Sequence, residues 1–389
     1  MSGSQNPLVK FFTSLKLTVV LLLLSIVLVF CATLNQVHLG VWGVQAKWFR
    51  SFFVWQDVNG FKLPIFPGGF TLGALLLANL IVSHVYRFKL SWKKAGITIT
   101  HAGLILLLIG EFVTAIYQQE FQMRLDEGQT GNYSESPRFV ELAITDVTGP
   151  DFDQVVAIPY DHLKSDEVIQ RPELPFTVKP LSYQPNTVLQ MKTQTPNAPA
   201  SGADRDIGAR LSVTPAPITY NDNERNLPAA LIELTGPEGS LGKWLVSPWL
   251  VEPQRFDYAG RTFALSLRFQ REYKPFTLTL LDFKHDRYPG TDIPKNFSSR
   301  LRLKNPQTND DRDVLIYMNN PLRYDGLTFY QQSFANDDKT TILQVVSNPG
   351  WLIPYISCIM LTLGLVVQFS ISLYGFNKRR QAARTAEKT

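Results

Sequence analysis

The sequence is poor in cysteine, and this limits its chemistry. Only two cysteines occur in 389 residues, Cys31 and Cys358, and both lie inside long apolar segments. The polar part of the chain therefore contains no cysteine pair, and it is not a small domain held together by disulfides. The motifs C-x-x-C and C-x-x-C-H are also absent. This excludes a thiol relay and a c-type cytochrome.

The motifs of common enzyme classes are absent as well. The chain has no G-x-S-x-G, H-E-x-x-H or P-loop sequence, so it offers no nucleophile elbow, zinc-protease helix or nucleotide-binding loop. Its formal net charge is +5, and the positive charge lies largely in clusters beside the apolar segments. We therefore expect no nucleic-acid partner.

Four long apolar segments dominate what is present. They cover residues 15–34, 66–86, 97–117 and 351–374, and roughly 20 helical residues suffice to cross a hydrocarbon core of ~30 Å. The first segment has an alternative interpretation as a cleaved signal peptide. Its apolar run is longer than such a peptide needs, and no clear A-x-A-like site follows it. We expect four transmembrane helices in a 3+1 order.

Positive charge beside these segments predicts the orientation. The loop 87–94 carries four basic residues and no acidic one, Lys10 and Lys16 flank the first segment, and the tail 375–389 is basic. Basic residues next to transmembrane helices collect on the cytoplasmic side. We therefore expect both termini in the cytoplasm and the large region 118–350 outside.

The outer region alternates between apolar and polar residues, as strands do. The runs 263–269 and 276–280 alternate most clearly, and 139–144, 230–234, 314–318 and 341–346 are also strand-like. The expected fold is thus an integral membrane α-helical protein with a large extracytoplasmic all-β sandwich-like domain. Residues 1–117 form the membrane part, and its aromatic segment 41–55 suits an interfacial position.

Two histidines, His84 and His101, lie inside the second and third apolar segments. Ionisable side chains within a membrane are costly and are candidates for functional sites. The two segments are joined by a short loop, so they should be antiparallel neighbours with both histidines near the cytoplasmic face. Neutral imidazole is a common axial ligand of haem iron. Hydrogen bonding between helices is the alternative, and it suits His101 in particular.

Basic residues lie at the same expected depth. Arg87, Lys93 and Lys94 stand where the two segments reach the interface, so they are candidate contacts for the propionates of a bound haem. Elsewhere, His162 and His285 are isolated in the sequence. We interpret His285 as a solvated side chain, with a loop ligand as the alternative.

The whole chain resembles the ResB (CcsB-type) family of System II cytochrome c biogenesis proteins. The resemblance includes the segments 15–24, 79–88 and 100–110, and it is most specific at Y-P-G (288–290), N-F-S-S (296–299) and N-N-P-L-R-Y-D-G-L-T-F-Y-Q-Q-S-F (319–334). Turn and core residue types predominate in this signature, so we expect it to define the fold. Its residues are Tyr288, Gly290, Ser299, Asn319, Pro321, Tyr324, Gly326, Tyr330 and Gln331.

The resemblance implies a subunit of a haem-delivery complex in a bacterial-type inner (plasma) membrane, with the large domain on the periplasmic side. The partner would be a CcsA/ResC-type protein with a tryptophan-rich motif, which is absent from this sequence. Non-covalent b-type haem would cross the membrane and be attached to C-x-x-C-H motifs of apocytochrome c that thiol-reducing proteins keep reduced. By local match, the metal-ligating role falls on His84, with His101 as the second candidate.

The resemblance favours a co-catalytic or non-catalytic subunit of a cytochrome c haem lyase complex, with no catalytic residue assigned in this chain. The alternative is a membrane scaffold that assembles or stabilises the partner haem-handling protein and never binds haem. Under that alternative, both histidines would serve only in packing and hydrogen bonding.

Overall fold

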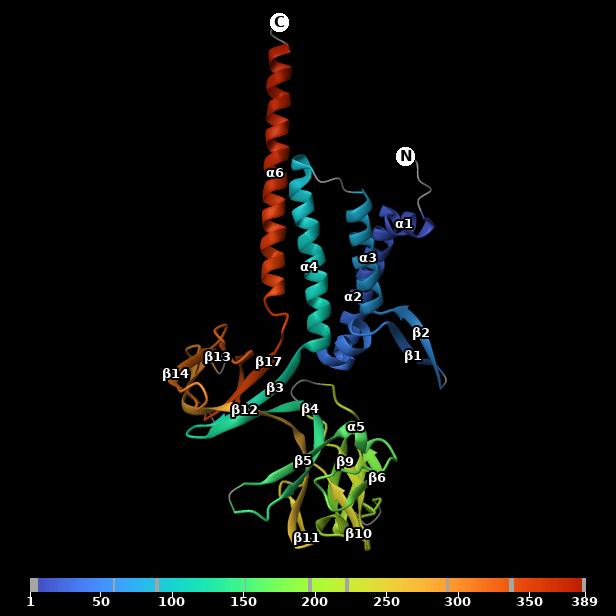
Figure 1. Cartoon of the computed structure of the whole chain (residues 1–389), viewed down its shortest axis with the longest axis vertical. Coiled ribbons are helices and arrows are strands. Elements are labelled where there is room, and N and C mark those ends of the chain that lie inside the picture. Colours follow the sequence, from blue (N-terminus) through green and yellow to red (C-terminus); the bar gives the residue numbers. More distant parts are fainter. Residues whose placement is uncertain are drawn as a thin grey trace. The chain divides into compact units, whose positions relative to one another are not determined.

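The computed structural model describes residues 6–58, 60–87, 91–150, 152–194, 198–220, 224–291, 294–335 and 339–386. The side chains of residues 87, 294 and 386 lie outside this description. The chain divides into two compact units (Figure 1). The helical unit comprises Met1–Gln119 and Ser347–Thr389, and the β unit comprises Glu120–Val346.

The helical unit contains the four expected apolar helices. Its elements are α1 (Pro7–Phe12), α2 (Leu15–Val44), η1 (Gln45–Phe49), β1 (Phe53–Val58), β2 (Phe61–Pro67), α3 (Gly69–Arg87), η2 (Trp92–Lys94), α4 (Ala95–Tyr117) and α6 (Ile353–Ala386). Among the described residues, the helical stretches Leu15–Phe49, Gly69–Tyr86, Trp92–Tyr117 and Ile353–Thr385 are long and apolar enough to cross a membrane. The prediction of four such helices is confirmed.

The first of these helices is longer than the sequence predicts. Helix α2 continues to Val44, past a kink where Gly40 has φ +62°, and is followed by the π-helical turn η1. The aromatic segment 41–55 is therefore helical only as far as Phe49. From Phe53 the chain pairs with β2 in an antiparallel hairpin, because the apolar run 61–67 offers a strand partner.

Helices α4 and α6 pack closely side by side (Figure 1). The contact face of α4 carries Gly96, Gly103 and Gly110, all buried and spaced seven residues apart. A Cβ on Gly96 would lie 2.5 Å from the Gln368 Cβ, and one on Gly110 would lie 2.5 Å from the Ile353 Cγ2. Glycines at helix contacts let the backbones approach, as in many membrane helix pairs.

The regular secondary structure described in the β unit is almost entirely strands. They are β3 (Gln119–Asp126), β4 (Thr130–Asp146), β5 (Gln154–Pro159), β6 (Thr177–Gln184), β7 (Thr187–Met191), β8 (Leu211–Pro215), β9 (Ala229–Gly236), β10 (Gly239–Val246), β11 (Gln254–Tyr258), β12 (Arg261–Arg287), β13 (Pro294–Asn305), β14 (Asp310–Tyr317), β15 (Leu322–Tyr324), β16 (Leu327–Ala335) and β17 (Thr340–Ser347). Two short helical turns, α5 (Tyr160–Leu163) and η3 (Ile207–Arg210), interrupt them.

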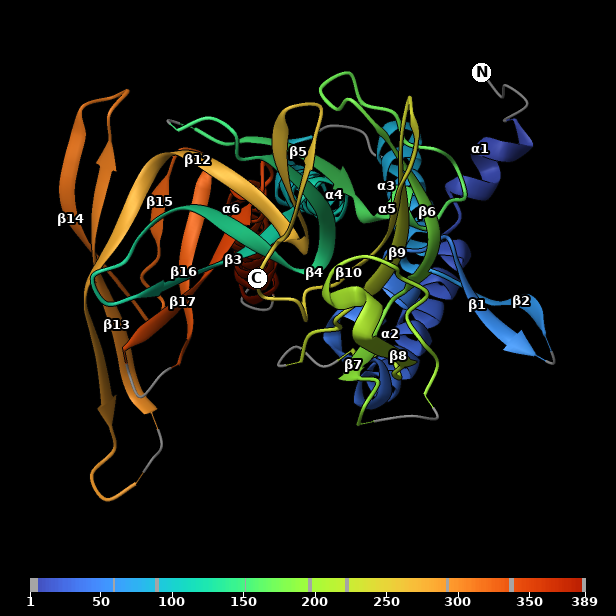
Figure 2. The same cartoon turned by 90° about the horizontal axis from the view of Figure 1, so that it is seen from below.

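The largest sheet is a nearly closed barrel, which corrects the prediction of a simple sandwich. Its order is β14-β13-β12-β4-β3-β17-β16-β15, with β5 beside β4 and β11 beside β12. The end strand β14 contacts β15 and β16, so the sheet curls round on itself (Figure 2). Its register shifts twice along β4 and β12, after Phe269 and after Tyr273. Such irregularities bend strands and allow a sheet to close.

Two large hydrophobic cores lie in the β unit, beside a small cluster of Leu211, Ala229 and Leu245. One lies inside the barrel and includes Leu278, Leu301, Phe329 and Leu343, all fully buried. The other lies where the three-stranded sheet β10-β9-β6 packs against β4, β5 and β12, so this part alone has the expected sandwich-like layering. Because β12 contributes side chains to both cores, the two halves share a strand.

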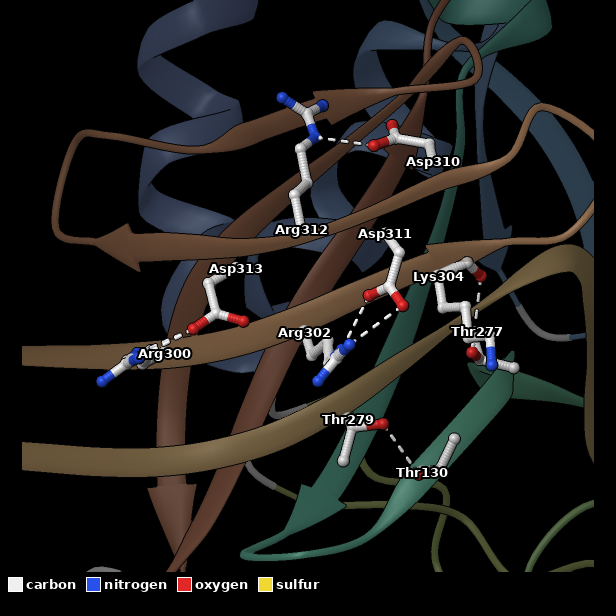
Figure 3. A network of polar contacts seen from close by, with 10 residues as sticks. All are labelled: Thr130, Thr277, Thr279, Arg300, Arg302, Lys304, Asp310, Asp311, Arg312 and Asp313. Atoms are coloured by element: carbon white, nitrogen blue, oxygen red, sulfur yellow. Dashed lines mark hydrogen bonds and ion pairs between the residues drawn. The ribbon is translucent and has the colours of Figure 1, made fainter.

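The outward face of β13 and β14 carries a ladder of ion pairs (Figure 3). Arg300 contacts Asp313 at 2.7 Å, and Arg302 forms two hydrogen bonds with Asp311 at 2.7 and 2.9 Å. Both are diagonal cross-strand pairs, because the register of the two strands places Arg302 opposite Asp313 and Arg300 opposite Leu315. Charges outside and apolar residues inside give this half the pattern of a water-soluble barrel.

Candidate functional site

The candidate site lies in the helical unit, where α3 carries His84 near its C-terminal end. Helix α3 is held to the N-terminal part of the unit by Asn79, whose side chain is almost fully buried. The Asn79 amide donates to the Phe12 carbonyl at 2.6 Å, and its oxygen accepts from the Thr18 hydroxyl at 2.7 Å. These hydrogen bonds fix α3 against α1 and α2. Interhelical hydrogen bonding by Asn79 is what its place in an apolar segment predicts.

His101 lies on α4, and the structure brings its ring next to that of His84. The ring centroids are 5.9 Å apart, and the planes meet at 73° in an edge-to-face arrangement. Both residues are half-buried. The expected antiparallel placement of the two segments therefore puts the histidines in direct contact, although they are seventeen positions apart in the sequence.

Helix α4 thus has two different contact faces. Its buried glycines face α6, as the close approach of Gly103 to Leu361 shows, whereas His101 faces His84 on α3. The glycine face fixes α4 against α6, so the imidazole is carried on an anchored helix. This is the arrangement that a ligand held in a defined orientation needs.

At the contact between His84 and His101, the two imidazoles are the candidate metal-ligating groups. Within the described ranges, no group of three or more His, Cys, Asp or Glu side chains could hold a metal ion. A structural zinc site of four protein ligands is therefore not formed by these residues. A haem iron needs only one or two axial imidazoles because the macrocycle supplies the other ligands. Two adjacent histidines fit such a group in their donor chemistry.

The candidate propionate contacts are only partly described. Arg87 is the last residue of α3, and its side chain lies outside the described residues. Lys93 and Lys94 lie in η2, directly before α4, and are exposed. The structure therefore places both lysines beside the end of the histidine-bearing helix, as the sequence predicts.

The signature residues lie in the core and turns of the β unit. Ser299 is fully buried, and its hydroxyl lies 2.6 Å from the Gln331 Oε1 and 2.8 Å from the Thr341 hydroxyl, which joins β13, β16 and β17. The Tyr324 hydroxyl lies 3.0 Å from the Asn305 amide. Positive φ angles of 63°, 73° and 76° occur at Asn319, Gly326 and Gly290, which are conformations that Gly and Asn tolerate.

The remaining signature residues lie close to these. Pro321 directly precedes the β15–β16 hairpin, and Tyr330 lies on β16. Tyr288 follows β12 and is exposed. No described residue of the signature belongs to a catalytic constellation. The signature residues thus stand at positions that shape the barrel.

His285 lies in a different setting from the one the sequence predicts. It is on strand β12 rather than in a loop, half-buried, and its ring centroid is 4.3 Å from that of Phe334 and 6.5 Å from that of Phe297. The interpretation as a solvated side chain was wrong because aromatic residues from β13 and β16 cover it. These strands are distant in sequence, and no local pattern indicates the contact.

A polar cleft in the β unit was also missed. It has a volume of about 600 Å³ and is lined by residues of β3, β4, β16 and the segment before β9. Its arginines, Arg124 and Arg225, are about one hundred positions apart in the sequence. Only the folded strands bring them to one place, so neither spacing nor composition could reveal it.

Comparison with known proteins agrees with the resemblance seen in the sequence. Residues 236–342 match the model of the ResB-like family, and this range contains all nine signature residues. A stretch of 92 residues is 38% identical to Protein NrfI of Wolinella succinogenes. That match covers 24% of this chain and 10% of NrfI, so the chain spans about a tenth of the relative. The two matches support assignment to the ResB-like family.

Proposed function

From its assignment to the ResB-like family, we propose that this chain is a membrane component of cytochrome c biogenesis. Haem is its substrate, received near one face of the membrane and passed on for covalent attachment to apocytochrome c. Three observations support this function: the ResB-like region, the four apolar helices, and the histidine pair within them. The contact between His84 and His101 is the single observation that carries the proposal.

His84 is the axial ligand in this proposal. It lies on α3, whose position is fixed by the buried Asn79, so its imidazole is presented in a defined orientation. His101 is the neighbour that positions the His84 ring through their edge-to-face contact. Lys93 and Lys94, and Arg87 at the end of α3, supply positive charge for the propionates at the membrane surface.

The proposed orientation follows from the basic residues. The loop between α3 and α4 and the C-terminal part of α6 carry most of the basic residues of the helical unit. We place both segments on the cytoplasmic side, where basic residues beside transmembrane helices collect. The β unit then lies outside the cytoplasm, where c-type cytochromes receive their haem. Thioether formation needs haem and two reduced thiols in a fixed geometry, which is largely a task of positioning.

The proposed complex includes a second membrane protein. A CcsA/ResC-type partner with a tryptophan-rich motif supplies the second axial histidine and the surface on which haem meets the C-x-x-C-H motif. Thiol-reducing proteins keep that motif reduced. This chain serves as a co-catalytic subunit because its described residues contain no catalytic constellation of their own.

The test is the haem content of the complex purified with its partner. His84→Ala should remove most of the bound haem and change the absorption bands of the remainder. His101→Ala should keep a larger share of haem with altered bands. His38→Ala is the matched control because His38 is an exposed histidine of the helical unit, and it should leave the haem content unchanged.

Unchanged haem content in His84→Ala would rule out the ligand assignment. Normal cytochrome c maturation after replacement of both histidines would favour a scaffold that never binds haem.

A further inference from the structure

The β unit contains a cleft that the haem function does not use. It opens where β3 and β4 separate, since the two strands pair at one position only, Gln122 with Glu135. Beyond that pair the strands diverge, and Arg124 and Tyr133 line the space between them. Gln332 of β16 and Arg225 line other walls. A volume of about 600 Å³ lies within the range of ligand-binding sites.

Two guanidinium groups supply positive charge and hydrogen-bond donors to this cleft. Arg225 is held in place, because its Nη2 donates to the Gln122 Oε1 at 2.6 Å and its guanidinium lies 4.6 Å from the centroid of the Phe269 ring. Arg124 lines the same cleft. Among the described residues, neither arginine forms an ion pair with a carboxylate, whereas Arg268 and Arg271 nearby on β12 do.

The two carboxylates that line the cleft already have partners. The Glu135 Oε1 accepts a hydrogen bond from the Arg271 Nε at 2.9 Å, and Arg271 also covers the Tyr133 ring. Asp126 accepts a hydrogen bond from the Thr340 hydroxyl on β17. The hydrogen bond from Thr340 leaves the charge of Asp126 in place, so the positive excess comes from Arg271: with it, three arginines face two carboxylates around the cleft.

The charges around Arg225 agree with a cleft that favours an anion. Burial lowers the pKa of the Arg225 guanidinium; Glu135 opposes this shift, and the nearby positive charge of Arg124 adds to it. A bound anion would relieve the repulsion between the two arginines. Carboxylates fit planar guanidinium groups best because two parallel hydrogen bonds can form.

The other walls of the cleft suit a polypeptide. Side-chain amides of Gln122, Gln129 and Gln332 line it, and each offers a donor and an acceptor to a peptide group. The Gln122 and Gln332 amides already contact each other at 3.0 Å, so they form a connected polar wall. The separated strands β3 and β4 leave room for an extended segment between them, in the manner of strand addition.

We propose that this cleft binds an acidic polypeptide segment in an extended conformation, with Arg124 and Arg225 recognising its carboxylates. The proposal goes beyond haem handling and does not depend on it, because none of these residues belongs to the histidine site. Arg124 and Arg225 select for negatively charged side chains, and the glutamine side-chain amides select for the peptide groups of an extended backbone.

The experiment measures peptide binding to the full chain in lipid nanodiscs without haem, by fluorescence anisotropy. The probe is a labelled pool of nine-residue peptides with Glu at every second position and Ser, Thr or Val elsewhere. The comparison pool has Gln in place of Glu. We expect the Glu pool to bind at least tenfold more tightly. The double variant Arg124→Gln/Arg225→Gln should lose this preference, and Arg225→Lys should weaken binding severalfold because it keeps the charge but not the paired hydrogen bonds.

A matched double variant separates recognition from net charge. Arg300→Gln/Arg302→Gln removes two guanidiniums from the exposed ladder of the same unit, and it should leave peptide affinity within twofold. Equal losses in the two double variants, equal binding of the Glu and Gln pools, or no binding of either pool would overturn the proposal. Competition by inorganic phosphate at the concentration of the peptide would also overturn it, in favour of a small-anion site. Each of these outcomes leaves the haem proposal unaffected.

Discussion

The two units differ in what they bury and what they expose. All buried residues of α4 are glycines, and α2 exposes leucines such as Leu22 and Leu23 at 50% and 58%. In the barrel, Phe329 and Leu301 are fully buried and charged pairs lie outside. The helical unit combines close backbone contact between α4 and α6, polar contacts such as those of Asn79, and a hydrophobic cluster that includes Leu21, Leu28 and Leu72. The β unit relies on side-chain volume. Each pattern suits a different solvent, lipid for the first and water for the second.

The largest expected effect tests the β unit. Phe329→Ala removes a fully buried ring from the barrel core, and such a cavity costs about 3–5 kcal/mol of unfolding free energy. Hydrogen exchange along β16, measured on the full chain in nanodiscs, should accelerate accordingly. Leu23→Ala, at an exposed position of α2, is the control and should change exchange in β16 little. Similar exchange in both variants would mean that the barrel core does not determine the stability of this unit.

An intermediate effect tests the helical unit. Gly96→Ala places a methyl group 2.5 Å from the Gln368 Cβ and the Gly364 carbonyl oxygen of α6, and such overpacking costs about 1–3 kcal/mol. We expect a lower thermal midpoint in nanodiscs. Gly73→Ala on α3 is the matched control because nothing lies within 4 Å of its added carbon. It should stabilise the helix slightly, since Ala favours helix over Gly by up to about 1 kcal/mol. A midpoint that moves the same way in both variants would contradict close packing of α4 on α6.

The smallest effect concerns the exposed ladder and its dependence on pH. The hydrogen bond from Arg302 lowers the pKa of Asp311 below its ordinary value of 3.8. The unfolded chain therefore binds the Asp311 proton more tightly than the folded chain does. The contribution of Asp311 to the free energy of unfolding is thus complete above pH 3.8 and is lost as pH falls through the lowered pKa. Asp311→Asn should make acid unfolding of the β unit less steep below pH 3.8 while changing little at neutral pH. A variant whose stability falls as steeply below pH 3.8 as that of the unchanged chain would contradict this.

The sequence predicts the local features of the molecule well. The apolar segments become α2, α3, α4 and α6, and each strand-like run lies within a strand, except that 314–318 extends one residue past β14. The ResB resemblance is confirmed by the family match to residues 236–342. The haem-ligand and orientation assignments stay predictions. Placing His84 and His101 side by side needed only the short loop between their helices.

Features that depend on distant contacts could not be predicted. The runs 263–269 and 276–280 read as two strands, yet both belong to β12, which continues across them because β4 and β13 pair with its two ends. Closure of the sheet requires β14 to meet β15 and β16. The same applies to His285, whose aromatic cover comes from β13 and β16, and to the cleft containing Arg124 and Arg225.

The pairing of β3 with β17 has a consequence for biosynthesis. These are the first and last strands of the β unit, and they are neighbours in the sheet. The barrel therefore cannot close until the ribosome has completed β17, whatever the folding speed of the intervening strands. At roughly 5–20 residues per second, β3 waits on the order of ten to forty seconds for its neighbour. During that time β3 lacks its neighbour, so closure of the barrel is among the last steps in the folding of this unit.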